Sequence, residues 1–179
     1  MGGPDRTALH AELERVRAEF RAWVDAASPA ELGRGSDGTR WTNRELLFHV
    51  LFGYLVTRNL RLLVKLVSRL PLPAQRGFAA ILDAGTKPFD WVNFWGSRAG
   101  GRVVSPAGMA SWLDRVIAAM HRHLDRESDA ALARSMAFPT RWDPYFAPRM
   151  TLAELYHYPT LHFDHHARQL TLEHPPTPH

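Results

Sequence analysis

Residues 151–170 read TLAELYHYPTLHFDHHARQL, and this stretch decides the fold class because it has the pattern of an amphipathic helix. Thr151 and Glu154 have the spacing of a capping box, in which each side chain accepts a hydrogen bond from the other residue's backbone N–H group. Apolar residues then recur at helical steps. We predict a helix from Thr151 to about Glu173, with a kink at Pro159, because proline removes a backbone donor and crowds the preceding turn.

The same predicted helix carries two histidines on one face. His162 and His166 are four residues apart, so their imidazoles lie one turn apart on the same side of a helix. Leu155 and Leu170 lie close to that face, which indicates that it points toward the core. This spacing is a common way for a helix to offer two nitrogens to one metal ion. His165 is rotated by about 100° from His166 and is not expected to share that ion.

Three further segments repeat apolar residues with the period of a helix. They run from about Asp5 to Ala27, from Thr42 to about Leu70, and from Ser105 through Leu124. The second begins with a capping box of Thr42 and Glu45 and ends before Pro71. Four long amphipathic helices with almost no strand signal predict an all-α protein, folded as a four-helix bundle.

Two long connections join the predicted helices. The first, Pro71 to Val104, is rich in aromatic residues and glycine, and part of it near Ala74–Asp83 could form a short helix. A crossover of this length suits a bundle whose helices do not simply alternate in direction. The second connection runs from Ala137 to Arg149. The only strand candidate is the short stretch Arg102–Val104.

Aromatic side chains are concentrated in both connections, and at this density they usually pack against other residues. They can fill the core or line a pocket, and we favour core packing. The residues concerned are Trp91, Trp95, Trp142 and Tyr145.

The chain has 179 residues, of which 45% are hydrophobic and 22% charged, as expected for one globular domain. We expect this domain to span residues 1–173 and the proline-containing tail, residues 174–179, to be disordered. No apolar run approaches the roughly 20 residues that cross a bilayer. The first residues lack the pattern of a signal peptide, so we expect no membrane association.

Cysteine is absent, which excludes disulfides, a protein thiolate nucleophile and cysteine-ligated zinc. A tight metal site must therefore use His, Asp or Glu. The absence also favours a cytoplasmic location.

The net charge of +4 permits an anionic partner without requiring one. A basic stripe on the second predicted helix could bind an anion or nucleic acid, but we favour a solvated face. Nothing in the sequence matches a nucleic-acid-binding module, so no such partner is expected. The stripe consists of Arg58, Arg61, Lys65 and Arg69.

A two-histidine site is weak alone, and the best candidate for a third ligand is His49. It lies on the core-facing side of the second predicted helix, near Gly53, which would allow close approach of another helix. If this helix neighbours the last one, His49, His162 and His166 form a three-histidine site with open positions, as in catalytic metal centres.

The alternative is chance, because the chain contains ten histidines and a four-residue spacing is then common. The histidines outside the proposed trio and the tail are interpreted as surface residues or as supports of the site. They are His10, His121, His123, His157 and His165.

Three motifs together resemble the DinB/YfiT-like metalloenzyme family. They are the Trp41-Thr42 start of the second helix, His49 one to two turns later, and the His-x-x-His-His-x-x-Gln run from His162 to Gln169. The resemblance covers roughly residues 5–172. It implies a four-helix bundle that holds a divalent metal near one end, with His49, His162 and His166 as the ligands.

The family includes thiol-dependent transferases and isomerases that use small thiols such as mycothiol or bacillithiol, and it implies a homodimer. Pro159 and the long aromatic connection depart from the familiar pattern and bear on the substrate. Imidazole suits zinc, nickel, iron and copper, so the metal stays open. No catalytic acid or base can be assigned.

Two carboxylates could orient the ligand imidazoles. Glu45 is interpreted mainly as a helix cap, and Asp164 as a surface carboxylate. We therefore predict a metal-dependent enzyme acting on small molecules, with thiol transfer as the favoured reaction. The alternative is a helical binding or stress-response protein that keeps the fold without catalysis.

Overall fold

The computed structural model describes residues 5–173, so the predicted tail at 174–179 lies outside the described residues. This part of the chain is mostly helical, as predicted. The elements are α1 (Arg6–Ala26), α2 (Pro29–Gly33), α3 (Asn43–Val67), α4 (Leu72–Ala84), α5 (Thr86–Val103), α6 (Pro106–Arg126), α7 (Asp129–Leu132), β1 (Ser135–Ala137), β2 (Arg149–Thr151) and α8 (Leu152–Ala167). None of these helices has the length and hydropathy needed to cross a membrane.

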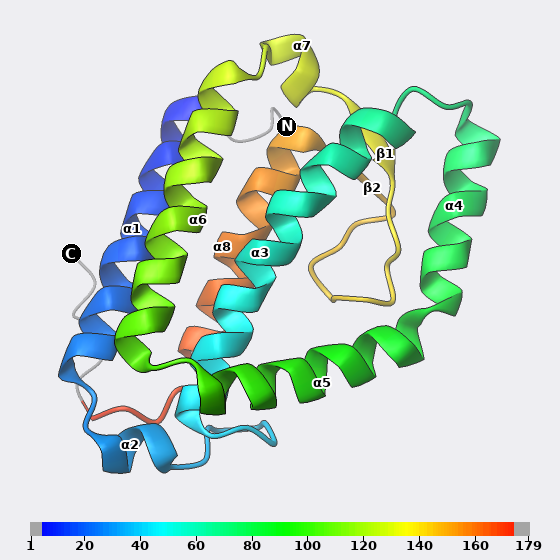
Figure 1. Cartoon of the computed structure of the whole chain (residues 1–179). Coiled ribbons are helices and arrows are strands. Elements are labelled where there is room, and N and C mark those ends of the chain that lie inside the picture. Colours follow the sequence, from blue (N-terminus) through cyan, green and yellow to red (C-terminus); the bar gives the residue numbers. More distant parts are fainter. Residues whose placement is uncertain (1–4, 174–179) are drawn as a thin grey trace.

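Four long helices, α1, α3, α6 and α8, pack around one hydrophobic core. Helix α3 contacts α6 and α8, and α1 contacts the same two helices from the other side. In Figure 1, α3 and α6 run in one direction, whereas α1 and α8 run in the opposite direction. The core is continuous across all four helices and includes the fully buried side chains of Leu13, Phe20, Leu51, Ile117 and Phe163.

The predicted helix starts are confirmed by their caps. Thr42 accepts a hydrogen bond from the backbone N–H of Glu45, and the Glu45 carboxylate accepts one from the backbone of Thr42. Thr151 and Glu154 make the same pair of bonds at the start of α8. Helix α8 ends at Ala167, earlier than predicted, because the residues that follow turn away to bond with α2 and α3.

The connection from Pro71 to Val104 consists of two helices, α4 and α5, and only α4 was anticipated. The glycines of α5 permit close packing. A Cβ atom at Gly101 would lie 2.7 Å from the Cα of Glu45 on α3. The strand expected at Arg102–Val104 is wrong, because Arg102 lies in the last turn of α5.

The two short strands occur instead on either side of residues 138–148. β1 and β2 are antiparallel, with Ser135 opposite Thr151. The loop between them is anchored to α4, since the indole N–H of Trp142 donates to the backbone oxygen of Leu82 at 2.7 Å. Figure 1 shows α5 crossing near the N-terminal ends of α3 and α6, with α4 turning back alongside the loop. This loop therefore reaches the site described below.

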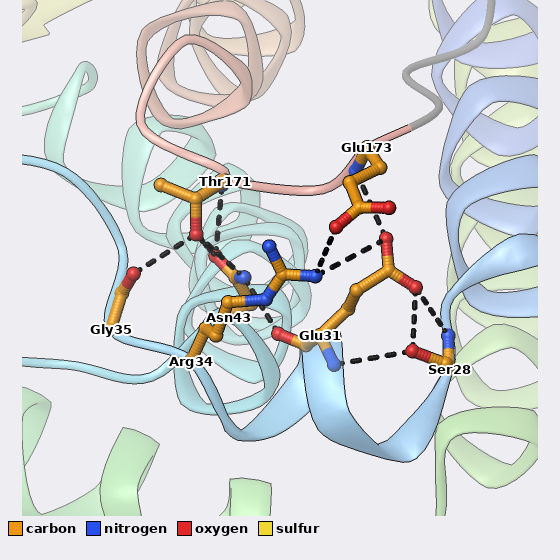
Figure 2. Close-up of polar contacts among 7 residues, drawn as sticks. All are labelled: Ser28, Glu31, Arg34, Gly35, Asn43, Thr171 and Glu173. Atoms are coloured by element: carbon orange, nitrogen blue, oxygen red, sulfur yellow. Dashed lines mark hydrogen bonds and ion pairs between the residues drawn. The ribbon is translucent and has the colours of Figure 1, made fainter.

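A polar network fixes the segment that follows α8 (Figure 2). The side chain of Asn43 is fully buried and donates to the backbone oxygen of Glu31 at 2.8 Å and to Oγ1 of Thr171 at 2.9 Å. Its own oxygen accepts the backbone N–H of Thr171 at 3.1 Å. Asn43 thus joins α2, α3 and the C-terminal segment.

Glu31 forms the other half of this network. Its carboxylate accepts hydrogen bonds from the hydroxyl and backbone N–H of Ser28 and from the backbone N–H of Glu173. The hydrogen bonds from Ser28, and then that from Glu173, lower the pKa of Glu31 to about 2. The carboxylate is therefore ionised at neutral pH and holds the segment through its charge.

Replacement of Asn43 by alanine should lower the free energy of unfolding by about 2–3 kcal/mol, because three hydrogen bonds are lost and buried backbone groups stay unpaired. Urea denaturation measures the change. Asn59→Ala is the matched control, since Asn59 is exposed and bonds only within its own helix. Its effect should stay within about 0.5 kcal/mol, and equal losses in the two variants would contradict the role given to Asn43.

Candidate metal centre

Three imidazoles converge between α3 and α8. His49 lies near the start of α3, and His162 and His166 lie in the last two turns of α8. The Nε2 atom of His49 is 3.0 Å from Nε2 of His166 and 3.1 Å from Nε2 of His162. Within residues 5–173, no other three His, Asp or Glu residues are close enough to share an ion. The structure therefore brings the three predicted residues to one point.

Hydrogen bonds to the outer nitrogens turn the imidazoles toward this point. Nδ1 of His49 lies 3.1 Å from the amide oxygen of Asn93 and 3.2 Å from the hydroxyl of Ser97, both on α5. Nδ1 of His166 lies 2.6 Å from the amide oxygen of Gln169. An amide oxygen only accepts, so Nδ1 carries the hydrogen and Nε2 keeps a free lone pair.

His162 is held by packing instead. Its Nδ1 is buried without a hydrogen-bond partner, and a Cβ atom at Gly53 would lie only 3.0 Å from it. Gly53 thus leaves the space that the ring occupies, as its position in the sequence suggested.

Asp164 does not support the imidazoles, in agreement with its interpretation as a surface carboxylate. Both of its oxygens lie 2.9 Å from the guanidinium of Arg15 on α1, away from the imidazoles. Glu45 acts as the cap of α3 and lies near Arg102, so the capping interpretation is confirmed. The residues that support the imidazoles are Asn93, Ser97 and Gln169, and no sequence pattern indicated this role for any of them.

Burial keeps the three imidazoles neutral. Loss of water contact, followed by the effect of His166, lowers the pKa of His49 to about 3. Burial also lowers the pKa of His166 to about 4 and that of His162 well below its usual value. Neutral imidazole is the form that binds metal ions.

The spacing of the nitrogens fits a shared metal ion. Two imidazole nitrogens bound at about 2.1 Å to one ion lie roughly 3.0–3.4 Å apart for angles between those of octahedral and tetrahedral geometry. The observed separations of 3.0 and 3.1 Å agree with this range. Three lone pairs directed at one point also require a cation or protons between them. The three-histidine cluster can therefore hold a metal ion.

A cavity of about 90 Å³ lies against the imidazoles, which is room for about three water molecules or a small substrate group. Its other walls are mostly apolar and aromatic. They include Phe52, Val56, Phe89, Trp142 and Phe146.

Asp143 is the one carboxylate among the described residues that line this cavity, and no sequence pattern singled it out. Its Oδ1 accepts the backbone N–H of Tyr145 at 2.8 Å, and its Oδ2 accepts the hydroxyl of Tyr158 at 2.9 Å. Oδ2 also lies 3.9 Å from Nε2 of His162. Burial raises the pKa of Asp143. The only sequence signal was its place among aromatic residues in a loop.

The aromatic residues of the two connections lie in different environments. Trp142 lines the cavity and stacks on Phe89, with 4.2 Å between the ring centroids. Tyr145 bonds to His165 through its hydroxyl. Trp91 and Trp95 are 65% and 47% exposed, so the core-packing interpretation is wrong for these two.

The basic stripe is partly structural. Lys65 and Arg61 lie 2.6 and 3.4 Å from the buried carboxylate of Glu127, so these two cations do not form a freely solvated face. Arg58 and Arg69 are exposed, as predicted.

Fold and site together define a mostly helical protein with a buried three-histidine centre. A family model described as the DinB superfamily matches residues 12–170, which is most of the chain. The chain therefore belongs to the DinB superfamily, and the resemblance noted in the sequence is confirmed. A comparison with curated proteins and one with solved structures gave no match.

The metal-free protein should lose stability as the pH falls from 6.5 to 4. A histidine in the unfolded chain has a pKa of about 6.5, whereas His49 and His166 have values of about 3 and about 4 in the fold. The unfolded state therefore binds more protons in this window, and the stability present above pH 6.5 is lost as the pH falls. We expect a decrease on the order of 2–4 kcal/mol, measured by urea denaturation with a chelator present.

The His49→Leu variant removes one of these groups and should show a shallower pH dependence. His157→Ala is the control, because His157 is partly exposed and pairs with Glu12 away from the centre. Identical slopes for the wild type and His49→Leu would show that the buried imidazoles do not cause the effect.

Proposed function

We propose that this protein is a metal-dependent enzyme that acts on small molecules, with thiol-dependent transfer as its reaction class. The observation that supports this most is the convergence of three imidazole Nε2 atoms on a cavity with aromatic walls. Three protein ligands leave positions for a further molecule, which is the arrangement of catalytic rather than structural sites. We also infer that α1, α3, α6 and α8 form the four-helix bundle of this family.

His49, His162 and His166 would hold the ion, and neutral imidazoles suit Zn²⁺, Ni²⁺ or Fe²⁺. When bound, such an ion lowers the pKa of a thiol or water and so supplies a nucleophile near neutral pH. The chain has no cysteine, so the thiol must come from a small cosubstrate. Asn93, Ser97 and Gln169 fix the ring orientations, and the aromatic walls limit the entry of water.

Asp143 is the residue that we assign to contact with the substrate. Tyr158 and the backbone of Tyr145 hold its carboxylate in place beside His162. A carboxylate acceptor beside mostly apolar and aromatic walls favours a substrate with a polar hydrogen at that position. Asp143 would therefore orient the reacting molecule by accepting a hydrogen bond from it.

The second candidate function is a helical binding or stress-response protein without catalysis. Its supporting observation is the outer side of α5, where Trp91, Val92 and Trp95 are exposed. For both candidate functions we propose a homodimer whose interface covers this side of α5. Nucleic acid is not proposed as a partner, because Arg61 and Lys65 of the basic stripe are paired with Glu127. The lack of cysteine supports a cytoplasmic location.

Protein purified without a histidine tag should contain metal at this centre, and His162→Ala should lose it. Elemental analysis measures the content, and the rise of Tm with added Zn²⁺ or Ni²⁺ provides a second readout. His157→Ala is the matched control and should keep the metal, since His157 lies on the same helix but bonds to Glu12. If the purified protein contains no metal and its Tm does not change with either ion, the enzyme proposal is overturned.

The Asp143→Asn variant should lower the rate of thiol transfer while the metal content stays unchanged. The assay follows the fluorescence of monochlorobimane as metal-loaded protein couples it to bacillithiol, mycothiol or glutathione. We expect a decrease of roughly 10- to 100-fold, because loss of the orienting contact misplaces the reacting molecule. Asp164→Asn is the control, because Asp164 pairs with Arg15 outside the cavity. If the metal-loaded wild type transfers none of these thiols, the result favours the second candidate function, a binding or stress-response protein without catalysis.

A further inference from the structure

A second pair of imidazoles lies between α1 and α6, two helices that carry no residue of the three-histidine centre. His10 on α1 and His121 on α6 face each other through their Nδ1 atoms, which are 2.5 Å apart. The rings are nearly parallel, with 10° between their planes and 4.8 Å between their centroids. Both side chains are mostly buried but keep some exposure, 28% for His10 and 19% for His121.

The outer nitrogen of each ring is bound to a carboxylate. Nε2 of His10 lies 3.0 Å from Oδ1 of Asp125, and Nε2 of His121 lies 2.6 Å from Oε1 of Glu14. An ionised carboxylate only accepts hydrogen bonds, so each Nε2 carries a hydrogen. A neutral imidazole has a single N–H group, and both Nδ1 atoms therefore present lone pairs to each other. Two opposed lone pairs at this distance repel unless a positive species lies between them.

We propose that His10 and His121 form a second metal-binding site, which takes a divalent transition ion such as Zn²⁺, Ni²⁺ or Cu²⁺. A ligand histidine whose other nitrogen donates to a carboxylate is the usual arrangement around such ions, and here both histidines have it. The two nitrogens must separate to roughly 3.0–3.4 Å to share an ion. This is a movement of less than about 1 Å, and rotation of the two partly exposed rings supplies it.

The site has two consequences for the molecule. Bound at two nitrogens from different helices, the ion links α1 to α6 and stabilises their contact. Only two protein ligands are present, so water completes the coordination, and the affinity is lower than that of the three-histidine centre. The negative charges of Asp125 and Glu14 favour a cation, although Arg17 offsets part of this by pairing with Glu14.

Isothermal titration of the His49→Ala/His162→Ala double variant with Zn²⁺ tests the site, because the two substitutions leave the other centre with His166 alone. We expect one ion per chain, and addition of His121→Ala should weaken binding by roughly tenfold or more. His157→Ala is the matched control. His157 also pairs one ring nitrogen with a carboxylate, that of Glu12 at 2.8 Å, but faces no second imidazole, so its loss should leave binding unchanged.

If the double variant does not fold, the wild type gives the same answer by stoichiometry, with two ions per chain against one in His121→Ala. Absence of Zn²⁺ binding in the folded double variant, or a wild-type stoichiometry that His121→Ala leaves unchanged, would overturn the proposal. A proton shared by the two Nδ1 atoms would then be the species between them. The metal content of the His162→Ala variant tests the three-histidine centre separately, so failure of one site does not imply failure of the other.

Discussion

The close approach of α3 to its neighbours is the constraint on which the site depends. Imidazole nitrogens 3.0 and 3.1 Å apart on two different helices require backbones that come near each other. Gly53 provides the room on the side of α8, where any Cβ atom would press on His162. Gly101 does the same on the side of α5. Two residues without side chains thus allow three helices to meet at one point.

The fold could be predicted largely from local patterns. The capping residues Thr42 and Thr151 marked helix starts because a side-chain oxygen that bonds the first backbone N–H groups works within one turn of chain. The four long helices followed from apolar residues at helical spacing. Helix α5 was missed because its glycines and aromatic residues lower helix propensity. Its helical state is stabilised by packing against α3, which no local pattern reports.

The candidate site, like the fold, was predictable only where local sequence patterns determine it. The shared face of His162 and His166 follows from the geometry of a helix, and His49 was placed by its core-facing position together with a family resemblance. Asp143 could not be found, because it lies in an irregular loop whose course is set by contacts with α4. Asp164 was interpreted correctly as a surface carboxylate, because a residue beside a histidine in sequence points elsewhere on a helix, here toward Arg15. Residues such as Asn93 reach the site only through the position of α5.

Helix α5 has an inner side that bonds to His49 through Asn93 and Ser97, and an outer side with Trp91 and Trp95 exposed. Helix α5 is long and regular, so a displacement of its outer side also displaces its inner side. A partner that presses on the two tryptophans would therefore alter the hydrogen bonds that orient His49. The same element thus connects the outer surface to the hydrogen bonds that set the orientation of the His49 imidazole.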